Sequence, residues 1–496
     1  MVAIQKGHGR RGFLAGMAAG VAVVGFNPER GSWVTEAHAW GQPFQCLPNL
    51  DGELFLDAAK LEEVSTDQGK IYDETPVAVL APGSSADIRK MVRYCRLYGI
   101  KVAMRGQGHH MGGFALCPGL VIDSRTLNTV HSIDPVNMIA DVDAGVTWKE
   151  LLELTVPMGL RPPVLTGYAE LSVGGVLAMG GTSGANAEGT KVEHVRKLTV
   201  VTGRGRQHEC SDAHRKPLFE ASLGGLGQVA LITRAEVELV PCESNVRQYQ
   251  LVYTDNAQYW ADYRTLLQRG EVPYMFTLFF PNPEGGWIYV LNVAAFYNEG
   301  DPPDDAYLLR DLNFPSFAAQ IDEFDFLTFA LLVDFQVEFW RQTIDWDNLK
   351  KPWIVNLLPD DIAEDFVGNT MAQLTPEDMG PGGFIVLFSM RRDTMTRPLP
   401  RVPDAALGDF VHNFGILTSS ATPTPDQAWI DGMLQRNLDL YDEAKGLGAT
   451  RYPIGAVPFD QGDWEEHFGD FFPALQLLKY LHDPQGILTP GPGIFG

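Results

Sequence analysis

Two adjacent histidines, His109 and His110, stand inside a glycine-rich stretch, MRGQGHHMGG (residues 104–113). An imidazole ring can bind a metal ion, exchange a proton or form a covalent bond through a ring nitrogen. Neighbouring side chains point apart and no carboxylate–histidine motif accompanies them, so the pattern argues against a metal site. We therefore expect chemistry other than metal binding at His109, and we interpret His110 as an exposed residue of the same loop.

Glycine is concentrated in two segments, residues 104–113 and 172–184, and each follows an apolar stretch. Glycine lets the backbone approach a ligand closely, and successive amide groups in such turns can surround a pyrophosphate. Neither segment has the GxGxxG spacing of a Rossmann turn, and GRGRQHE (203–209) also lacks it. The spacing alone leaves two alternatives open, a dinucleotide site of another type or a pair of tight connections.

Alternating strands and helices must position these segments. The pattern predicts a strand over 76–82, a helix over 86–98, a strand over 100–106, further strands within 119–130 and 139–146, and a helix after Thr147. After Pro241 the pattern favours antiparallel strands over 245–253, 273–280 and 287–297, with a helix over 257–270. This change of pattern predicts a second domain.

Composition excludes several classes of protein. A chain of 496 residues predicts two domains, and 45% hydrophobic with 20% charged residues is typical of a soluble globular protein. The net charge of −24 argues against nucleic acid or an anionic membrane as a partner. The five cysteines are widely spaced without a CxxC pair, which argues against a disulfide framework and a structural zinc site.

The first 39 residues have the pattern of an export signal. Arg10 and Arg11 precede an apolar run (13–26), and small residues at 37–39 form a plausible cleavage site. The stretch RRGFLAG is similar to a twin-arginine signal, and the apolar run is short for a membrane span. We expect removal of residues 1–39 and a secreted or periplasmic protein.

The segment RGQGHH (105–110) resembles the R-G-x-G-H-S segment of flavoproteins with the vanillyl-alcohol oxidase fold, and specifically of the cytokinin dehydrogenase branch. Four further segments resemble the same branch: 170–184, 224–239, 351–359 and 463–491. The resemblance implies an α+β protein with a two-lobed FAD-binding domain (40–243), a substrate domain with an antiparallel sheet flanked by helices (244–435), and a C-terminal segment (436–496) that completes the FAD-binding domain.

In this branch the histidine at the position of His109 is bonded through a ring nitrogen to the 8α-methyl group of FAD. Relatives of the berberine-bridge type attach FAD a second time through a cysteine, and Glu170 stands at that place here, so we expect a single attachment. The resemblance also implies other cofactor-binding residues: Arg105, Gly106, Gln107, Gly108, His110, Gly112, Gly113, Gly167, Ser172, Gly174, Gly175, Ala178, Thr182, Gly227, Ile232 and Pro492.

Two departures from the branch affect the chemistry. Gly167 stands where cytokinin dehydrogenases carry the aspartate that accepts the substrate's proton, and Pro492 replaces a glutamine near the flavin. Oxidation of an amine or alcohol needs a proton acceptor, and the remaining candidates are Glu170, Tyr168 and Tyr452. Asp334 and Glu338 share one face of a predicted helix and could meet a cationic substrate, or could form a solvated face.

These observations predict an exported FAD enzyme that oxidises a small amine or alcohol by hydride transfer to flavin N5, with oxygen or another acceptor reoxidising the flavin. The aromatic residues between 274 and 353 favour an apolar or aromatic substrate. Two alternatives remain: a true cytokinin dehydrogenase with a relocated base, and a flavin-containing protein that only binds a ligand. We expect no bound metal, no nucleic-acid partner and no membrane span.

Overall fold

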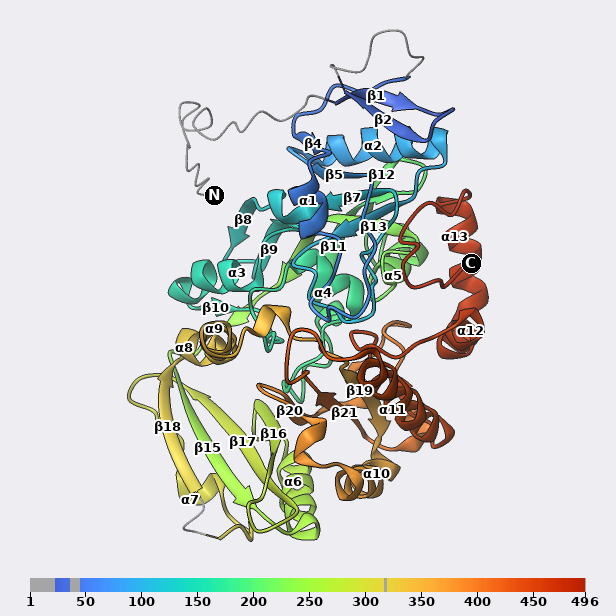
Figure 1. Cartoon of the computed structure of the whole chain (residues 1–496). Helices are drawn as coiled ribbons and strands as arrows, with labels where there is room; N and C mark the ends of the chain where they lie inside the picture. Colours follow the sequence, from blue (N-terminus) through green and yellow to red (C-terminus); the bar gives the residue numbers. More distant parts are fainter. Residues whose placement is uncertain (1–22, 36–44, 316–318, 496) are drawn as a thin grey trace.

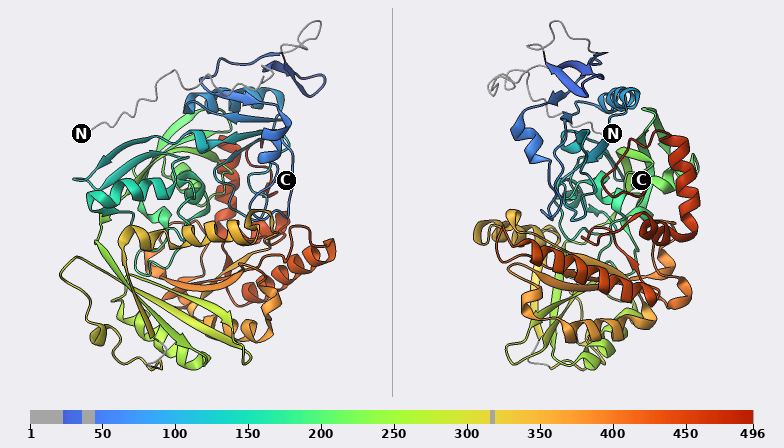
Figure 2. Two further views of the ribbon diagram at one scale, coloured as in Figure 1. Left: turned by 60° about the vertical axis from the view of Figure 1, so that its left-hand side comes forward. Right: turned by 45° about the vertical axis from the view of Figure 1, so that its right-hand side comes forward.

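The computed structural model describes residues 23–35, 45–315 and 319–495. Figures 1 and 2 show two parts, one above the other, which we call the FAD-binding part and the substrate part after the domains that the resemblance implies. Three larger sheets and flanking helices make up the two parts. The prediction of an α+β fold with two domains is confirmed. No helix in the described ranges is long and apolar enough to cross a bilayer.

The first lobe of the FAD-binding part is a four-stranded sheet in the order β4-β5-β7-β6, in which β7 pairs in parallel with β5 and β6. The lobe contains β4 (Glu53–Phe55), α1 (Ala58–Glu63), β5 (Ala78–Ala81), α2 (Ser85–Tyr98), β6 (Val102–Arg105) and β7 (Leu120–Asp123). Helix α2 buries Ile88, Met91, Val92 and Cys95 at helical spacing against the sheet. It ends at Gly99, whose φ of +68° suits glycine.

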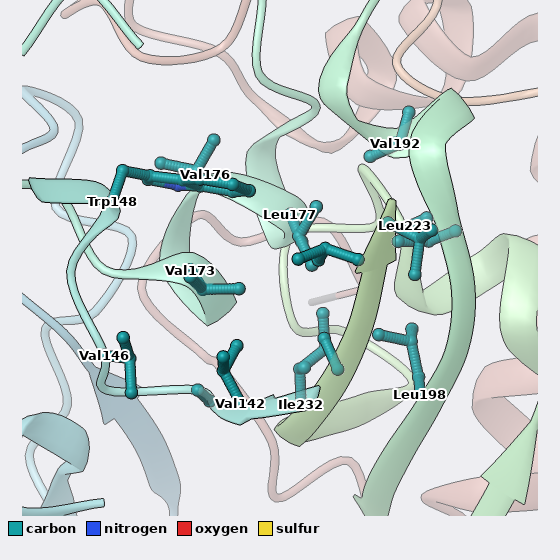
Figure 3. Packing of buried hydrophobic residues seen from close by; sticks show 14 of the residues in the cluster. Val142, Val146, Trp148, Val173, Val176, Leu177, Val192, Leu198, Leu223 and Ile232 are labelled. Atoms are coloured by element: carbon teal, nitrogen blue, oxygen red, sulfur yellow. The ribbon is translucent and has the colours of Figure 1, made fainter. Parts of the chain in front are cut away.

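The second lobe is an antiparallel sheet in the order β12-β11-β13-β9-β8. Its strands are β8 (Val130–Asp134), β9 (Ile139–Asp143), β11 (Val195–Thr202), β12 (Gln207–Cys210) and β13 (Ala230–Glu238), and its helices are α3 (Trp148–Thr155), α4 (Val173–Met179) and α5 (Lys216–Ser222). Figure 3 shows the core between them, where Val173 and Leu177 of α4 face Val142 and Ile232 of the sheet. This packing fixes α4, which carries Gly174 and Gly175 of the second glycine-rich segment. Beside this lobe, β10 (Leu160–Arg161) pairs with β14 (Val240–Pro241).

The substrate part is one antiparallel sheet of eight strands, in the order β18-β15-β17-β16-β20-β21-β19-β22. The strands are β15 (Asn245–Tyr253), β16 (Tyr274–Pro281), β17 (Trp287–Tyr297), β18 (Ala319–Asp325), β19 (Ile354–Pro359), β20 (Phe384–Arg391), β21 (Phe410–Leu417) and β22 (Thr450–Arg451). The helices are α6 (Asn256–Arg269), α7 (Asp305–Leu308), α8 (Phe326–Ala330), α9 (Leu332–Thr343), α10 (Asp360–Gln373) and α11 (Gln427–Gly446). The domain limits stay predictions, and the limit at 435 falls inside α11.

The chain then returns to the FAD-binding part through α12 (Gln461–Phe468) and α13 (Phe472–His482), at the right of Figure 1. The backbone after α13 pairs with the edge strand β6: Val102 N donates to Ile487 O at 2.8 Å, and Thr489 N donates to Val102 O at 2.8 Å. The C-terminal segment therefore supplies the edge partner of the strand that leads into the His109 loop.

The leader prediction differs from the structure in one respect. Residues 23–35 form a hairpin of β1 (Val23–Asn27) and β2 (Ser32–Thr35), which also pairs with β3 (Gln45–Cys46). The ring centroid of Phe26 lies 5.1 Å from that of Trp33 within the hairpin and 6.0 Å from that of Tyr98 on α2. The twin-arginine pair and the proposed cleavage site lie outside the described residues.

The predicted cap of α3 is confirmed and can be tested. Thr147 Oγ1 accepts from Glu150 N at 3.1 Å, and the Glu150 carboxylate accepts from Thr147 N at 2.8 Å, which together form a capping box. We expect Thr147→Ala to lower the free energy of unfolding by about 1 kcal/mol in chemical denaturation. Thr265→Ala, in the exposed interior of α6, is the matched control and should change it by less than about 0.5 kcal/mol. Equal losses in both variants would contradict a capping role.

Candidate active site

The loop between β6 and β7 is held by one buried carboxylate. Asp67 Oδ2 accepts from Gly113 N at 2.8 Å and bonds His110 Nδ1 at 3.1 Å, and its Oδ1 accepts from Gly69 N at 2.9 Å. The other ring nitrogen of His110, Nε2, accepts from Ala115 N at 3.2 Å, so the proton is on Nδ1. The prediction that His110 is exposed is wrong, because its side chain is only 12% exposed. Instead, the residue shapes the loop.

His109 points away from this network into an aromatic environment. Its ring centroid lies 4.9 Å from that of Tyr168 and 5.8 Å from that of Trp353. Burial, together with the nearby positive charge of Lys351, lowers the pKa of His109 to about 4. The imidazole is therefore neutral at pH 7, and one ring nitrogen keeps a free lone pair.

The two glycine-rich segments meet, as the resemblance implies for one site. Ser172 caps α4 by accepting from Gly175 N at 3.4 Å, and a side chain on Gly106 would come within 2.2 Å of Ser172 Oγ. On the other side of this turn, a side chain on Gly174 would come within 2.6 Å of Ala144 Cβ. Both glycines are needed for these close approaches.

The residues of the His109 loop fit the pyrophosphate of FAD. Arg105 donates to Thr66 O at 2.6 Å but forms no ion pair with any described residue, and burial lowers the pKa of its guanidinium. Its guanidinium lies against Gly108, where a Cβ would come within 2.3 Å of Cζ. Within the described chain, the amide groups of Gln107 and Gly108 donate to no acceptor. A half-buried cation without an ion-pair partner, beside free amide donors, suits a bound dianion.

Elements distant in sequence bring further candidates to these loops. Tyr452 is buried, and its hydroxyl accepts from Gly181 N at 2.9 Å. Thr182 Oγ1 accepts from Asn413 Nδ2 of β21 at 3.1 Å.

The O atom of Ala178 accepts from Leu226 N at 2.9 Å, which joins α4 to the turn before β13. The side chain of Ile232 is in the core, so only its backbone could meet a cofactor (Figure 3).

A cavity of about 440 Å³ lies between the His109 loop and the C-terminal segment. Gly112, Gly113 and Pro492 line it together with Arg451 and aromatic side chains. Pro492 O accepts from Trp464 Nε1 at 2.8 Å, so this residue contributes a backbone acceptor that is already engaged. Gly227 (φ +69°) lies near this segment because its O atom accepts from Thr489 Oγ1 at 2.9 Å.

The three candidate bases have different surroundings. Glu170 is paired with Lys149 Nζ at 2.7 Å, and its side chain is 39% exposed. The hydroxyl of Tyr452 already accepts from Gly181 N, in the turn after α4. Tyr168 lies against His109, and the hydroxyl of Tyr168 accepts from Arg341 Nη2 at 3.3 Å. Gly167 leaves open space, because an added Cβ would meet nothing within 4 Å.

Sequence reasoning missed three residues around this site. Asp67 and Arg341 organise the loops, and Lys351 donates to Leu349 O at 2.9 Å. Burial lowers the pKa of Lys351 to about 7. Spacing gives no signal for Asp67 or Arg341, since their partners are distant in sequence, but Lys351 precedes Trp353 in a segment that resembles the family. Asp334 is buried, so it does not lie on a solvated face, and its carboxylate accepts from Ala169 N and Glu170 N. Oε2 of Glu338 lies 3.8 Å from Nη1 of Arg341.

The aromatic residues of the substrate part divide among three clusters, one of which (Tyr274, Phe296, Phe324, Phe326 and Phe329) packs with the core of the FAD-binding part. Trp340, Trp346 and Trp353 pack in one cluster with Tyr168 and Tyr452, whereas most of the others fill the core of the eight-stranded sheet. The described residues contain no group of three or more histidine, cysteine or acidic side chains arranged to hold a metal ion.

Comparisons with known proteins agree with this site. The model of the family "FAD binding domain" matches residues 76–211, and that of "Cytokinin dehydrogenase 1, FAD and cytokinin binding" matches residues 250–495. The chain is therefore an FAD-dependent oxidoreductase.

Several relatives resemble almost the whole chain. An uncharacterised oxidoreductase from the fasciation locus of Rhodococcoides fascians is 31% identical over 89% of this chain and 99% of its own length. Cytokinin dehydrogenase 6 of Oryza sativa is 30% identical over 90% of this chain and 92% of its own length. Cytokinin dehydrogenase 2 of Arabidopsis thaliana is 28% identical over 90% of this chain and 94% of its own length. The chain belongs to the cytokinin dehydrogenase family.

The contact between the glycine loops predicts a compensating pair of substitutions. Gly106→Ala should separate the loops, lower the amount of bound flavin and cost about 1–3 kcal/mol of stability, because its Cβ would overlap Ser172 Oγ. Ser172→Gly removes the overlapping atom and, as an N-cap change, costs only a few tenths of a kcal/mol. The double variant should therefore regain flavin, as measured by absorbance of the purified protein. A double variant as poor as Gly106→Ala would contradict this contact.

Proposed function

We propose that the protein is an exported oxidoreductase that holds FAD covalently through His109 and oxidises a small amine or alcohol. The observation that carries the covalent attachment is the neutral imidazole of His109 among aromatic rings. A neutral ring nitrogen has the lone pair that a bond to carbon requires. The family resemblance supports the same position.

Bound FAD would accept a hydride at its N5 atom, and oxygen or another acceptor would reoxidise it. Arg105 and the amide groups of Gln107 and Gly108 would hold the pyrophosphate, and Gly112, Gly113 and the backbone of Pro492 would lie along the cofactor. Trp340, Trp346 and Trp353 would exclude water above the site, which supports an apolar or aromatic substrate.

We propose that the hydroxyl oxygen of Tyr168 accepts a hydrogen bond from the substrate's N–H or O–H group and so positions the reacting heteroatom. Its ring lies against His109, and Arg341 donates to its hydroxyl at 3.3 Å. Burial raises the pKa of Tyr168 and the positive charge of Arg341 opposes this. The carboxylate of Glu170 is engaged by Lys149, and Tyr452 is engaged by the α4 turn, so both are poorer candidates.

A second candidate is a true cytokinin dehydrogenase with a relocated base. The description of the family model over residues 250–495 and the names of the relatives favour it. Gly167 opposes it, since it cannot accept a proton. Anaerobic reduction of the flavin by isopentenyl-adenine, amines and primary alcohols would separate the two candidates.

Export is the remaining part of the proposal, and it is supported by the arginine pair and the small residues at 37–39. Cleavage there would remove β1 and β2 but no residue of the three larger sheets. A twin-arginine route carries folded proteins, which suits a protein that takes up its cofactor before it leaves the cytoplasm.

Acid precipitation tests the covalent bond. We expect the yellow flavin of the wild type to precipitate with the polypeptide, and that of His109→Ala to stay in the supernatant. His131→Ala removes an imidazole that is paired at the surface with Asp143 at 2.8 Å, and it should precipitate with its flavin. Colourless wild-type precipitate would exclude the attachment.

A substitution at Gly167 tests the missing base. Because an added side chain meets open space, Gly167→Asp should place a carboxylate at the family position without a clash. We expect the rate of flavin reduction by isopentenyl-adenine to rise about 100-fold in anaerobic stopped-flow measurements. Gly167→Asn has the same size but cannot accept the proton, so an equal gain in both variants would contradict this explanation.

A further inference from the structure

Helix α9 of the substrate part is largely exposed, and two of its polar side chains, Asp334 and Arg341, contact the FAD-binding part. Of its residues only Asp334 and Val337 are buried, whereas Phe335 and Phe339 are 56% and 58% exposed. Asp334 and Arg341 are seven residues apart, which is two helical turns, so they lie on one face. Both reach across the domain boundary to the segment 168–170.

Asp334 binds the backbone of that segment with both carboxylate oxygens. Oδ2 accepts from Ala169 N at 3.0 Å, and Oδ1 accepts from Glu170 N at 3.1 Å. The residue is 8% exposed, so these bonds are shielded from water. Burial raises the pKa of Asp334 to about 6, and the two amide donors oppose that shift.

The opposite side of the segment is held by α3 of the FAD-binding part. Lys149 N donates to Ala169 O at 2.7 Å, and Trp148 N donates to Leu171 O at 3.0 Å. The segment is thus bound by one helix from each part, and Tyr168 is its first residue. Arg341 adds a bond to the hydroxyl of Tyr168, at the far end of the ring that lies against His109.

We propose that Asp334 and Arg341 are positioning residues, through which helix α9 of the substrate part fixes Tyr168 against His109. The inference rests on the proposed role of Tyr168 in positioning the substrate's heteroatom and deepens it. The FAD-binding part carries the tyrosine, but the substrate part determines where its hydroxyl lies. Any movement of α9 is then transmitted to the reacting group.

Hydrogen exchange tests the contact without a substrate. In Asp334→Asn the amide nitrogen faces one of the two N–H donors, so one bond is lost and the exchange of the 169–170 amides should become about tenfold faster in the holoenzyme. Asp334→Glu keeps both acceptor oxygens and should restore part of the protection. Asp325→Asn is the matched control: Asp325 accepts from Thr328 N at 3.0 Å at the start of α8, and Asn can replace it there.

A double-mutant cycle separates positioning from general stability. Asp334→Asn and Arg341→Gln should each lower kcat about tenfold with little change in KM, because the tyrosine is misplaced only for the chemical step. In a Tyr168→Phe background the same changes should have almost no further effect on kcat, whereas a purely structural role would give additive losses.

Unchanged exchange of the 169–170 amides, or additive losses of kcat, would overturn the inference. If no donor reduces the flavin of the wild type, the proposed function fails. The exchange result then still decides whether Asp334 holds the segment.

Discussion

The organisation of the active site depends on the buried carboxylate of Asp67. Through four hydrogen bonds it joins Gly69 and Lys70 of its own turn to His110 and Gly113 of the following loop. A buried carboxylate destabilises the fold unless its oxygen atoms are hydrogen-bonded, so the two loops are held in the one arrangement that supplies these donors. By fixing His110, it turns the neighbouring His109 toward the aromatic side chains of the other part.

Local sequence patterns correctly predicted the helices and strands that bury one of their faces in a core. The spacing of apolar residues predicted α2, the alternation predicted β15 and β17, and the cap at Thr147 predicted the start of α3. Local patterns could not predict the pairing of residues 487–489 with β6, because the two segments are far apart in the sequence; only the family resemblance indicated that the C-terminal segment completes this part. The hairpin of residues 23–35 was missed because its apolar residues also fit a leader, and the same residues satisfy both patterns.

The candidate site was predictable where the backbone itself is the functional group. Glycines at 106 and 174 mark close approaches that any side chain would prevent, and the sequence shows them directly. Side-chain partners were less predictable: the surface ion pair of Glu170 and the role of Asp334 depend on which distant element packs beside them. His110 was misjudged for the same reason, since its partner Asp67 lies 43 residues earlier.

The pairing of β6 with the C-terminal segment has a consequence for biosynthesis. Lys101 Nζ donates to Gly486 O, 385 residues further along the chain, and the adjacent backbone completes the sheet edge beside the His109 loop. While the ribosome is still translating the substrate part, that edge has no partner. The edge beside the His109 loop is therefore completed only after residues 486–489 have been synthesised, so we expect this loop to take its final geometry late in folding.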